Sequence, residues 1–575
     1  MAVSRRARSF EADSAHSVTL PGGQVAHRAH VEQSQRLARS FSQVCQGVWC
    51  LVGNGLSNQT FIEGPDGIIA IDTGESIEEM NEALGELRQV TSKPVVAVMY
   101  THFHYVAGTR AVLDSGVAKF GQDTPVWGHE RIAENRRRTA SEIGTAYGRG
   151  LVEQFSIMLP DSGPDGNVNV GLGNFYRNPA HAPFTNGFVV PTHTFAEPTT
   201  IIVAGLEIEV MPAPSDADDS VTYWFKSLGV AVNNLVWPVL FNIFAIRGEE
   251  YRDPRVMLRG LDHLLSLGAQ HLVGAHGPHI SGAVAISERV TKYRDSIQLL
   301  WDQTVRATNM GLTSTEVAQF VDLPAGYDDD YLTSELYGVV EHHARQIRSG
   351  LFGFFDGDEA NLFPTPPQER ATRLVAGMGG RDSVRSQVVT AIDADDLRWA
   401  LELGSWLVRS DDAQEQDRKL LARALRLVAQ RTPAANIRGW CLTRALSLEG
   451  AINTERLRTH RLREGAVVSG GYDKSVHILR VLLDPQRAEG VNIRLSFVFD
   501  GVNTTGLHIR NSVAVPTDGD SYDVQIKTSL TAWAKIVSGA VTLSQAVSDK
   551  TIAVDGDTAQ FQAAMACFDI ESLRS

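Results

Sequence analysis

Two histidines separated by a single residue, His102 and His104, stand in the segment Thr101-His-Phe-His-Tyr. They follow VVAVMY at 95–100, a short continuous apolar run typical of a strand that is buried on both faces. Where such a strand turns into a loop, both imidazoles can point at one position, and neutral imidazole is a ligand for zinc, iron and similar ions. The motif alone is weak evidence, because an HxH pair also occurs by chance or as packed core histidines. The strand that precedes it favours a metal centre with His102 and His104 as ligands.

The neighbouring segments have the patterns of a mixed α/β domain that could hold such a centre. Short apolar runs predict strands, and one run is broken by Pro65-Asp66-Gly67, a hairpin-turn signal. Helices are expected at 76–91 and 254–267. Residues 155–200 are rich in Gly, Pro and Asn and predict a long loop, which is often a functional element. Further strands are expected within 44–74 and at 199–213, 222–225, 230–234 and 271–276.

Length, composition and charge limit the class of protein. A chain of 575 residues exceeds one ordinary hydrophobic core and predicts two to four domains. The net charge of -14 argues against a nucleic-acid partner, because phosphate recognition needs a basic face. The sequence contains no apolar run of about 18 residues that would predict a membrane span. Acidic residues follow Arg5-Arg6 where an export signal needs an apolar stretch, so we expect a cytoplasmic protein whose four cysteines are thiols.

The pattern of residues changes along the chain in a way that predicts separate domains. Residues 1–40 are polar and mixed in charge, as in an N-terminal arm. Apolar residues recur at helical spacing from about 285 to 450, which predicts a bundle of helices. Alternating strands return from about 455 and are followed by two short helices. We predict an arm (1–40), a catalytic domain (41–300), a helical domain (301–452) and a C-terminal α+β domain (453–575).

Several segments resemble known proteins. The loop after the apolar run, with Asp72-Thr73-Gly74 closing an earlier strand, resembles the HxHxDH loop of the metallo-β-lactamase superfamily. AIRGEEYRD at 245–253, the run at 331–369 and FVFDG at 497–501 resemble the alkylsulfatase family within that superfamily. The resemblance spans about 40 to 575 and implies a multidomain fold of mixed class. Its parts would be a metallo-β-lactamase-like αββα sandwich, a helical dimerisation domain that makes a homodimer, and a domain like sterol carrier protein.

The chain departs from the family at the metal-binding loop. The family's aspartate and third histidine, which bind the second metal, are replaced by Val106 and Ala107, and neither side chain can coordinate an ion. A metal-bridging carboxylate of the family aligns with Asn234, which is neutral and a poorer ligand. The resemblance therefore implies a complete first site and a second site that must be rebuilt or lost.

The retained ligands follow from the same resemblance. The carboxylate of the first site aligns with Asp216, which joins His102 and His104, and the last histidine of the family aligns with His276. The expected metal ligands are therefore these four residues. Nearby residues that could rebuild the second site are Tyr105, Asp218, Asp219, Asn234 and His279.

Several of these side chains also have simpler interpretations. Asp218 and Asp219 are more often solvated loop charges, and His279 could simply line the pocket. A packing or pocket role is the simpler interpretation of Tyr105. Asp72 is expected to brace the ligand loop as a hydrogen-bond acceptor. The remaining aromatic residues near the centre, expected to shape an apolar substrate pocket, are Phe103, Trp237 and Phe241.

The ligand type leads to a prediction of the reaction. Two histidines and one carboxylate with open positions are typical of non-haem iron oxygenases. The motif HFHYVAGT resembles an alkylsulfatase-related branch of non-haem diiron monooxygenases, which hydroxylate coenzyme A-linked terpenoids in bacterial secondary metabolism such as antibiotic biosynthesis. We predict an O₂-dependent hydroxylase with two iron ions, a hydrophobic, possibly CoA-linked substrate and an electron donor. The alternatives are a dinuclear zinc hydrolase of sulfate or other esters and a non-catalytic lipid- or acyl-binding descendant.

Overall fold

The computed structural model describes residues 9–139, 142–458 and 464–569. The chain forms two compact units, of which the first contains residues up to 135 and 150–452. The second contains residues 136–149 and those from 453 onwards. Among the described residues, no helix is both long enough and apolar enough to cross a membrane.

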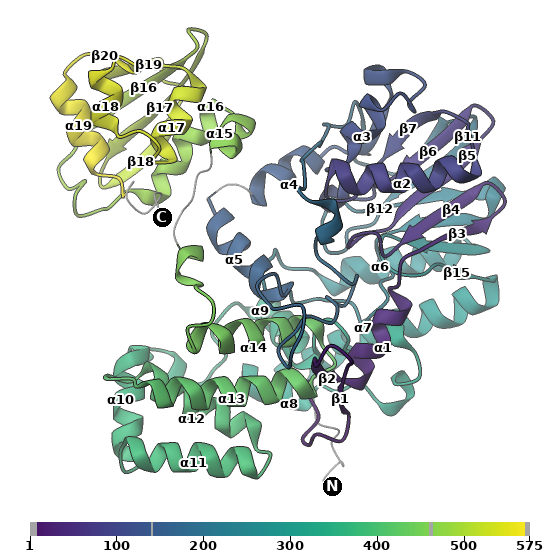
Figure 1. Cartoon of the computed structure of the whole chain (residues 1–575), viewed down its shortest axis with the longest axis horizontal. Coiled ribbons are helices and arrows are strands. Elements are labelled where there is room, and N and C mark those ends of the chain that lie inside the picture. Colours follow the sequence, from purple (N-terminus) through teal and green to yellow (C-terminus); the bar gives the residue numbers. More distant parts are fainter. Residues whose placement is uncertain (1–8, 140–141, 459–463, 570–575) are drawn as a thin grey trace. The chain divides into compact units, whose positions relative to one another are not determined.

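The first unit contains two β-sheets stacked in a sandwich (Figure 1). The first sheet is antiparallel from β3 to β6 and parallel from β6 to β9. The second is antiparallel except for the parallel pair β13–β14. The first sheet contains, in spatial order, β3 (Ser40–Cys45), β4 (Val48–Val52), β5 (Gln59–Gly64), β6 (Gly67–Ile71), β7 (Val95–Met99), β8 (Val126–His129) and β9 (His193–Phe195). The second contains β10 (Thr199–Val203), β11 (Leu206–Pro212), β12 (Val221–Phe225), β13 (Val230–Asn233), β14 (His271–Gly274) and β15 (Ile280–Ser281).

Helices cover the outer faces of both sheets. Between the sheets, side chains such as Ile69 from β6 and Val232 from β13 belong to one buried core. Helix α2 (Ile77–Val90) packs on the first sheet, where its Leu84 joins a core shared with β4 and β7. On the second sheet lie α6 (Pro254–Ser266) and α7 (Ala283–Asn309), which share a core with β13 and β14. The arrangement is the predicted metallo-β-lactamase-like αββα sandwich.

Local sequence signals account for several of these elements. Strands β5 and β6 pair with Gly64 opposite Gly67, so Pro65 and Asp66 form a two-residue turn at the predicted hairpin. Strand β7 is buried along its whole length, as its continuous apolar run predicts. Helix α2 begins after Ser76, whose hydroxyl accepts a hydrogen bond from the backbone N–H of Glu79.

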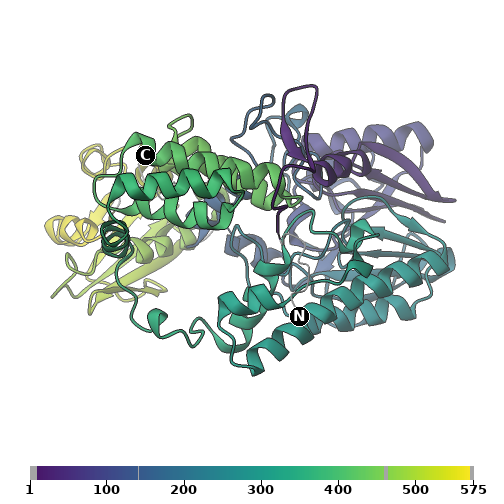
Figure 2. The ribbon, with the colours of Figure 1, turned by 90° about the horizontal axis from the view of Figure 1, so that it is seen from below.

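Helices make up most of the rest of the first unit (Figure 2). Helix α7 runs through residue 300, where the sequence predicts a domain boundary, and contacts both α6 and α9. In the predicted N-terminal arm, the described residues form β1 (Ser17–Thr19), β2 (Val25–His27) and α1 (Arg28–Arg36). The helical region contains α8 (Ser314–Phe320), α9 (Val340–Phe352), α10 (Pro367–Gly377), α11 (Arg381–Asp393), α12 (Leu397–Arg409), α13 (Glu415–Arg431) and α14 (Ala435–Leu448).

The second unit is an α+β domain with its own hydrophobic core. Its sheet has the order β18-β17-β16-β19-β20, and the pair β16–β19 is parallel. Trp533 is fully buried at the centre of this core, against Phe497 of the sheet. The strands are β16 (Ile493–Phe499), β17 (Asn503–Arg510), β18 (Val513–Thr517), β19 (Val524–Thr528) and β20 (Ala553–Asp555). The helices are α15 (Glu464–Gly470), α16 (Tyr472–His477), α17 (Leu530–Val537), α18 (Leu543–Ser548) and α19 (Thr558–Ala566). The unit boundaries near residues 135 and 150 fall within α4 (Ile132–Thr139) and α5 (Gly144–Gln154).

Candidate metal centre

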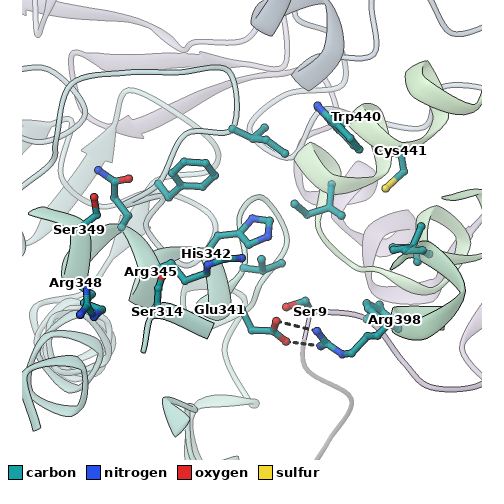
Figure 3. A pocket seen from close by; sticks show the side chains of 18 of the residues that line it. Ser9, Ser314, Glu341, His342, Arg345, Arg348, Ser349, Arg398, Trp440 and Cys441 are labelled. Atoms are coloured by element: carbon teal, nitrogen blue, oxygen red, sulfur yellow. Dashed lines mark hydrogen bonds and ion pairs between the residues drawn. The ribbon is translucent and has the colours of Figure 1, made fainter. Parts of the chain in front are cut away.

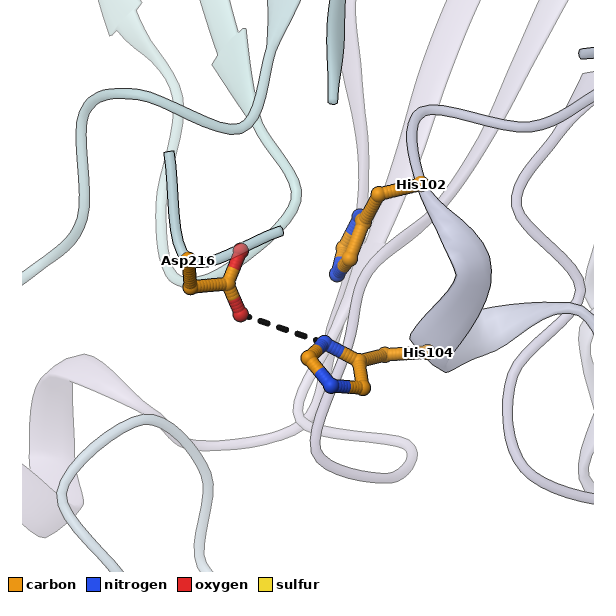
Figure 4. A group of neighbouring side chains, drawn as sticks. All are labelled: His102, His104 and Asp216. Atoms are coloured by element: carbon orange, nitrogen blue, oxygen red, sulfur yellow. Dashed lines mark ion pairs between the residues drawn. The ribbon is translucent and has the colours of Figure 1, made fainter. Parts of the chain in front are cut away.

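Loops from both sheets bring two histidines and one carboxylate together. His102 follows β7 in an extended conformation, and a 3-10 helix at Phe103–Tyr105 then carries His104. Asp216 lies between β11 and β12 of the second sheet. One ligand atom each of His102, His104 and Asp216 lies within 4.8 Å of the other two. Figure 4 shows the three side chains pointing toward one another across the gap between the two loops.

His102 is oriented by a chain of hydrogen bonds behind the cluster. Asp72 accepts hydrogen bonds from the backbone N–H of Thr101 at 2.8 Å and from its hydroxyl at 2.6 Å. The same hydroxyl lies 2.9 Å from Nδ1 of His102. Because its proton is donated to Asp72, the hydroxyl must accept from Nδ1–H, which leaves the lone pair of His102 on Nε2. This network gives Asp72 the bracing position that the sequence predicts.

His276 carries its ring proton on the same nitrogen as His102. Its Nδ1 lies 2.9 Å from the backbone carbonyl of Leu56, which can only accept, so Nδ1 carries the proton and Nε2 is the open nitrogen. Burial lowers the pKa of His276 to about 4 and that of His102 to about 3. Both rings are therefore neutral near pH 7, which is the form that binds metals.

His104 is turned the other way round. Its Nδ1 lies 3.1 Å from Oδ2 of Asp216, and its Nε2 lies 4.0 Å from Oε1 of Glu249. Burial acts to raise the pKa of Asp216, but the neighbouring His102 and His104 hold it well below its usual range. Asp216 is therefore ionised and can bind a cation within the cluster.

The residues present fit a divalent metal ion. Among the described residues, Nε2 of His102, His104 and His276 is buried without a hydrogen-bond partner. Buried polar atoms are normally satisfied, so the open Nε2 atoms of His102 and His276 call for an electrophile. His104 turns its Nδ1 rather than its Nε2 toward Asp216. The ligand atoms that lie within 4.8 Å of one another belong to His102, His104 and Asp216, and His276 is outside that group. Imidazole nitrogen and carboxylate oxygen form the usual ligand set of a catalytic zinc site, and they also suit iron.

The other half of the centre is apolar where the resemblance implied ligands. Val106 is fully buried and Ala107 is 4 % exposed, so both belong to the packed interior. The Asn234 side-chain NH₂ donates to Asp216 Oδ1 at 2.6 Å, and its Oδ1 accepts from the Trp237 indole at 3.1 Å. Asn234 thus braces Asp216 and has its own oxygen engaged, rather than presenting it toward the cluster.

The remaining candidates for the second site differ in their burial and in their partners. Asp218 is paired with Arg131 and accepts from the Asn135 side chain at 2.7 Å, so it is a loop charge. Asp219 is fully buried beneath the ligand loop, and burial raises its pKa to about 7. His279 is half-buried, and burial lowers its pKa with a smaller contribution from His271.

The aromatic residues surround the cluster as packing. The ring centroid of Tyr105 lies 5.1 Å from that of His102 and 5.2 Å from that of His276. Phe103 is buried in the core that includes side chains of α2, and its ring centroid lies 4.0 Å from that of His104. Trp237 and Phe241 are also buried, with ring centroids 4.6 Å apart. Phe103, Tyr105 and Trp237 therefore pack against the histidines, and Phe241 packs against Trp237.

Two charged residues near the cluster were missed by the sequence reasoning. Arg252 is 3 % exposed, donates to the backbone carbonyl of Asn242 at 2.5 Å, and lies 6.0 Å from the ring centroids of Trp237 and Phe241. Within the described part of the chain, its Nε and Nη2 have no hydrogen-bond partner. Glu249, next to His104, forms an ion pair with Arg247 at 2.9 Å. Both lie in AIRGEEYRD, and a run of acidic and basic residues in a loop is by itself too common to mark a site.

Comparison with known proteins decides the family. Residues 52–105 match the metallo-beta-lactamase superfamily, 313–451 match alkyl sulfatase dimerisation and 473–573 match alkyl sulfatase C-terminal. A linear primary-alkylsulfatase of a Pseudomonas species is 32 % identical over 527 residues, which cover 89 % of this chain and 98 % of that protein. The chain belongs to the alkylsulfatase family. An (R)-specific secondary-alkylsulfatase of Pseudomonas is 30 % identical over 92 % of this chain and 80 % of its own length. The solved structure of the stereoselective inverting sec-alkylsulfatase Pisa1 from Pseudomonas has a TM-score of 0.83 at 26 % identity and covers 97 % of this chain and 88 % of that one.

The relatives correct the predicted reaction. The named relatives are alkylsulfatases and therefore hydrolases, so the prediction of an O₂-dependent hydroxylase is wrong. The predicted diiron centre, electron donor and role in antibiotic biosynthesis have no support from these comparisons. The error has a physical cause, because a set of two histidines and one carboxylate is common to hydrolytic zinc sites and iron oxygenases and does not separate them.

Proposed function

We propose that this chain is a metal-dependent hydrolase of esters with a hydrophobic alkyl group, with alkyl sulfates as the first substrate class to test. The carrying observation is the convergence of buried His102 and Asp216 with half-buried His104 in a chain of the alkylsulfatase family. The metal ligands would be His102, His104, Asp216 and His276. Zinc is the ion favoured by the relatives, and when bound it would supply Lewis acidity and a water of lowered pKa.

The residues around the cluster would bind and orient the substrate. Arg252 is a buried cation with two N–H groups open, and guanidinium groups match the planar arrangement of anionic oxygens. It could therefore hold the sulfate group near the cluster. Trp237 and Phe241 lie against Arg252 and exclude water, which strengthens its attraction for an anion.

We propose that one zinc ion is held firmly. Val106 and Ala107 offer no donor, and the Asn234 oxygen already accepts from Trp237. A second divalent ion would then have His276 as its only strong protein ligand from the predicted set. Tyr105, with its ring beside His276, and Glu249, beside His104, are the residues that remain close enough to assist.

The experiment measures metal content and hydrolysis on the same preparation. The purified full-length chain is loaded with zinc, its metal content is determined by mass spectrometry, and sulfate release is followed with dodecyl sulfate and with a secondary alkyl sulfate. We expect bound zinc and sulfate release that a chelator abolishes and zinc restores. Zinc-loaded protein that releases no sulfate from either class, and hydrolyses no carboxylic ester of the same chain length, would contradict the proposal.

The second unit is proposed to have the sterol-carrier-protein-like role that its sequence resemblance implied. Its apolar core around Trp533 would present or shield the alkyl chain of a substrate. The measurement is binding of a fluorescent fatty acid to the full chain, compared with a chain that ends before residue 453. Equal binding by the two chains would argue for a structural appendage.

Two further predictions also remain proposals. They are the domain boundaries at 40, 300 and 452 and the cytoplasmic location.

A further inference from the structure

A large cavity lies among the helices that follow the sandwich. Residues of α9, α12, α13 and α14 line it, together with Phe244 and Ile246 of a loop from the first unit (Figure 3). Its volume is about 710 Å³, which falls within the range of roughly 300–1,000 Å³ that is usual for small-molecule pockets. Its lining, as far as the structure describes it, includes none of His102, His104 and Asp216. The cavity is therefore a site distinct from the candidate metal centre.

The interior of the cavity is apolar. Leu425 and Val428 of α13 are buried side chains of the helical core, and they form one part of the wall. Phe244, Leu401 and Trp440 form other parts. Walls of this kind offer few partners to a polar ligand, whereas burying hydrocarbon against them is favourable. The interior therefore favours a ligand with an alkyl chain.

Most of the ionisable groups in the wall are already neutral or paired. Glu341 and Arg398 form an ion pair, drawn with dashed lines in Figure 3. Burial lowers the pKa of His342, so its ring is neutral near pH 7. Burial also raises the pKa of the Cys441 thiol to about 12, so this group is neutral as well. These four residues add no net charge to the cavity.

Two further arginines leave the cavity positively charged. Arg345 is exposed and takes part in no ion pair among the described residues. Arg348 is only 7 % exposed and donates to the backbone carbonyl of Phe355 at 3.3 Å. Within the described part of the chain its Nε is buried without a hydrogen-bond partner. Because buried N–H groups are normally bonded, this side chain calls for an acceptor.

The two arginines lie where a ligand could enter. They are three residues apart on α9 and therefore on one face of that helix. Phe354, which also lines the cavity, is 90 % exposed, so the cavity opens to solvent beside the end of α9. In Figure 3, Arg345 and Arg348 lie on the opposite side of the cavity from Trp440. Positive charge near the mouth and apolar walls inside match a molecule with one anionic end.

We propose that this cavity binds an amphiphilic anion, namely a single alkyl chain that ends in a carboxylate or a sulfonate-like group. The chain would lie along the apolar walls, and the anionic oxygens would accept hydrogen bonds from Arg345 and Arg348. Guanidinium groups suit both head groups, because their N–H groups match the planar arrangement of anionic oxygens. The site does not use the metal ligands, so the proposal does not depend on which ester the metal centre hydrolyses.

Photolabelling tests where such an anion binds. Most of the lining falls within residues 313–451, which match alkyl sulfatase dimerisation, so the test uses the full-length protein in its assembled form. The probe is dodecanoic acid with a diazirine at the end of its chain, and labelled peptides are identified by mass spectrometry. We expect label on α13 or α14, in competition with unlabelled dodecanoate. Label confined to residues from 453 onwards, or to the loops that carry His102 and Asp216, would overturn the proposal.

A charge reversal tests the role of the arginines. Dissociation constants of dodecanoate, dodecane-1-sulfonate and dodecan-1-ol are measured by titration calorimetry. Arg345→Glu should weaken binding of both anions about 10-fold or more, because a charged hydrogen bond is lost and a like charge is introduced. Binding of the alcohol should hardly change. The anion that binds more tightly to the unaltered protein is the head group that the site selects.

The control for this variant is Arg370→Glu. Arg370 is also an exposed arginine of the helical region, but it lies outside the cavity lining. Because both arginines are exposed, both variants should fold, as checked by circular dichroism. Equal affinity for the anions in Arg345→Glu and in the unaltered protein would refute the placement of the head group.

Chain length tests the apolar interior. Octanoate, decanoate and dodecanoate carry the same head group, so their affinities differ only through the hydrocarbon. Burial in the cavity should lower the dissociation constant roughly 3- to 4-fold for each added methylene. Affinity that does not change with chain length would mean that the anions bind only to surface charge, and the proposal would fail.

Discussion

The two sides of the candidate metal centre differ in the donors that they offer to a metal ion. On one side, His102, His104 and Asp216 converge. Thr101 orients His102 and Asn234 braces Asp216, while His104 and Asp216 face each other. On the other side, Val106 and Ala107 pack into the interior within three residues of His104. A loop can therefore be packed along its whole length while only part of it offers donors to a metal ion. The fold needs the loop's shape, whereas the chemistry needs the donors.

Removing a ligand from the intact half should have the largest effect. His102→Ala deletes one of the clustered ligands, and zinc affinity should fall by more than the roughly 100-fold that loss of an outer partner costs. Metal content after dialysis and sulfate release measure the loss. His279→Ala is the matched control, because His279 is half-buried and outside the cluster. A variant that retained full metal content would contradict the placement of the centre.

Restoring ligands at positions 106 and 107 should add a second zinc ion. Val106→Asp/Ala107→His returns a carboxylate and an imidazole to the ligand loop, and we expect a second equivalent of zinc per chain. Because both positions are buried, larger side chains should destabilise the metal-free protein by about 1–3 kcal/mol. Thermal unfolding with and without zinc measures both effects, with Val106→Thr/Ala107→Ser as a control that adds polarity without strong ligands. If the stoichiometry stays at one, the loop does not place these side chains as the family does.

Weakening a brace of the intact half should have an intermediate effect. Asp72→Asn offers Thr101 an amide in place of the carboxylate that orients its hydroxyl toward His102. Zinc affinity should fall about 10–100-fold, as for other outer partners of metal-binding histidines. The control is Asp66→Asn in the exposed β5–β6 turn. Affinity measured by competition with a chromogenic chelator would show no difference between the two variants if Asp72 were only a packing residue.

The smallest effect is expected at Glu249. Its carboxylate is 4.0 Å from His104 and is shared with Arg247, so Glu249→Gln should lower zinc affinity by no more than about 10-fold. Glu250→Gln is the neighbouring control, since Glu250 is exposed. An effect as large as that of His102→Ala would mean that Glu249 is itself a ligand and that the poorer half of the loop is rebuilt from this segment.

The comparison also shows what a sequence can predict. Apolar runs and turn residues were sufficient to predict strand β7, the hairpin at Pro65-Asp66 and helix α2 from the sequence. The pattern of burial and the chemistry of turns are local properties of the sequence. The direction of the Asn234 amide could not be predicted, because it depends on Asp216 and Trp237 meeting in three dimensions. Arg252 was missed for the same reason, since only the fold buries it beside Trp237 and Phe241.

The reaction was harder to predict than the site. The sequence directed attention to His102 and His104, and the absence of donors at Val106 and Ala107 was visible in it. The step from those absences to an oxygenase failed because similar ligand sets serve hydrolysis and oxidation. The type of ligand limits which metal can bind. Only the similarity to alkylsulfatases over most of the chain indicated which reaction to expect.

Helix α7 has a consequence for how this protein can be divided. Its 27 residues make a rod about 40 Å long that begins on the second sheet and ends among the helices. Residue 300 falls within its continuous turns, and Leu300 is fully buried. An expression fragment that ended there would interrupt a helix and expose its buried apolar side chains, because residue 300 does not lie in a linker. The sandwich and the helices that follow it should therefore be produced, purified and unfolded together.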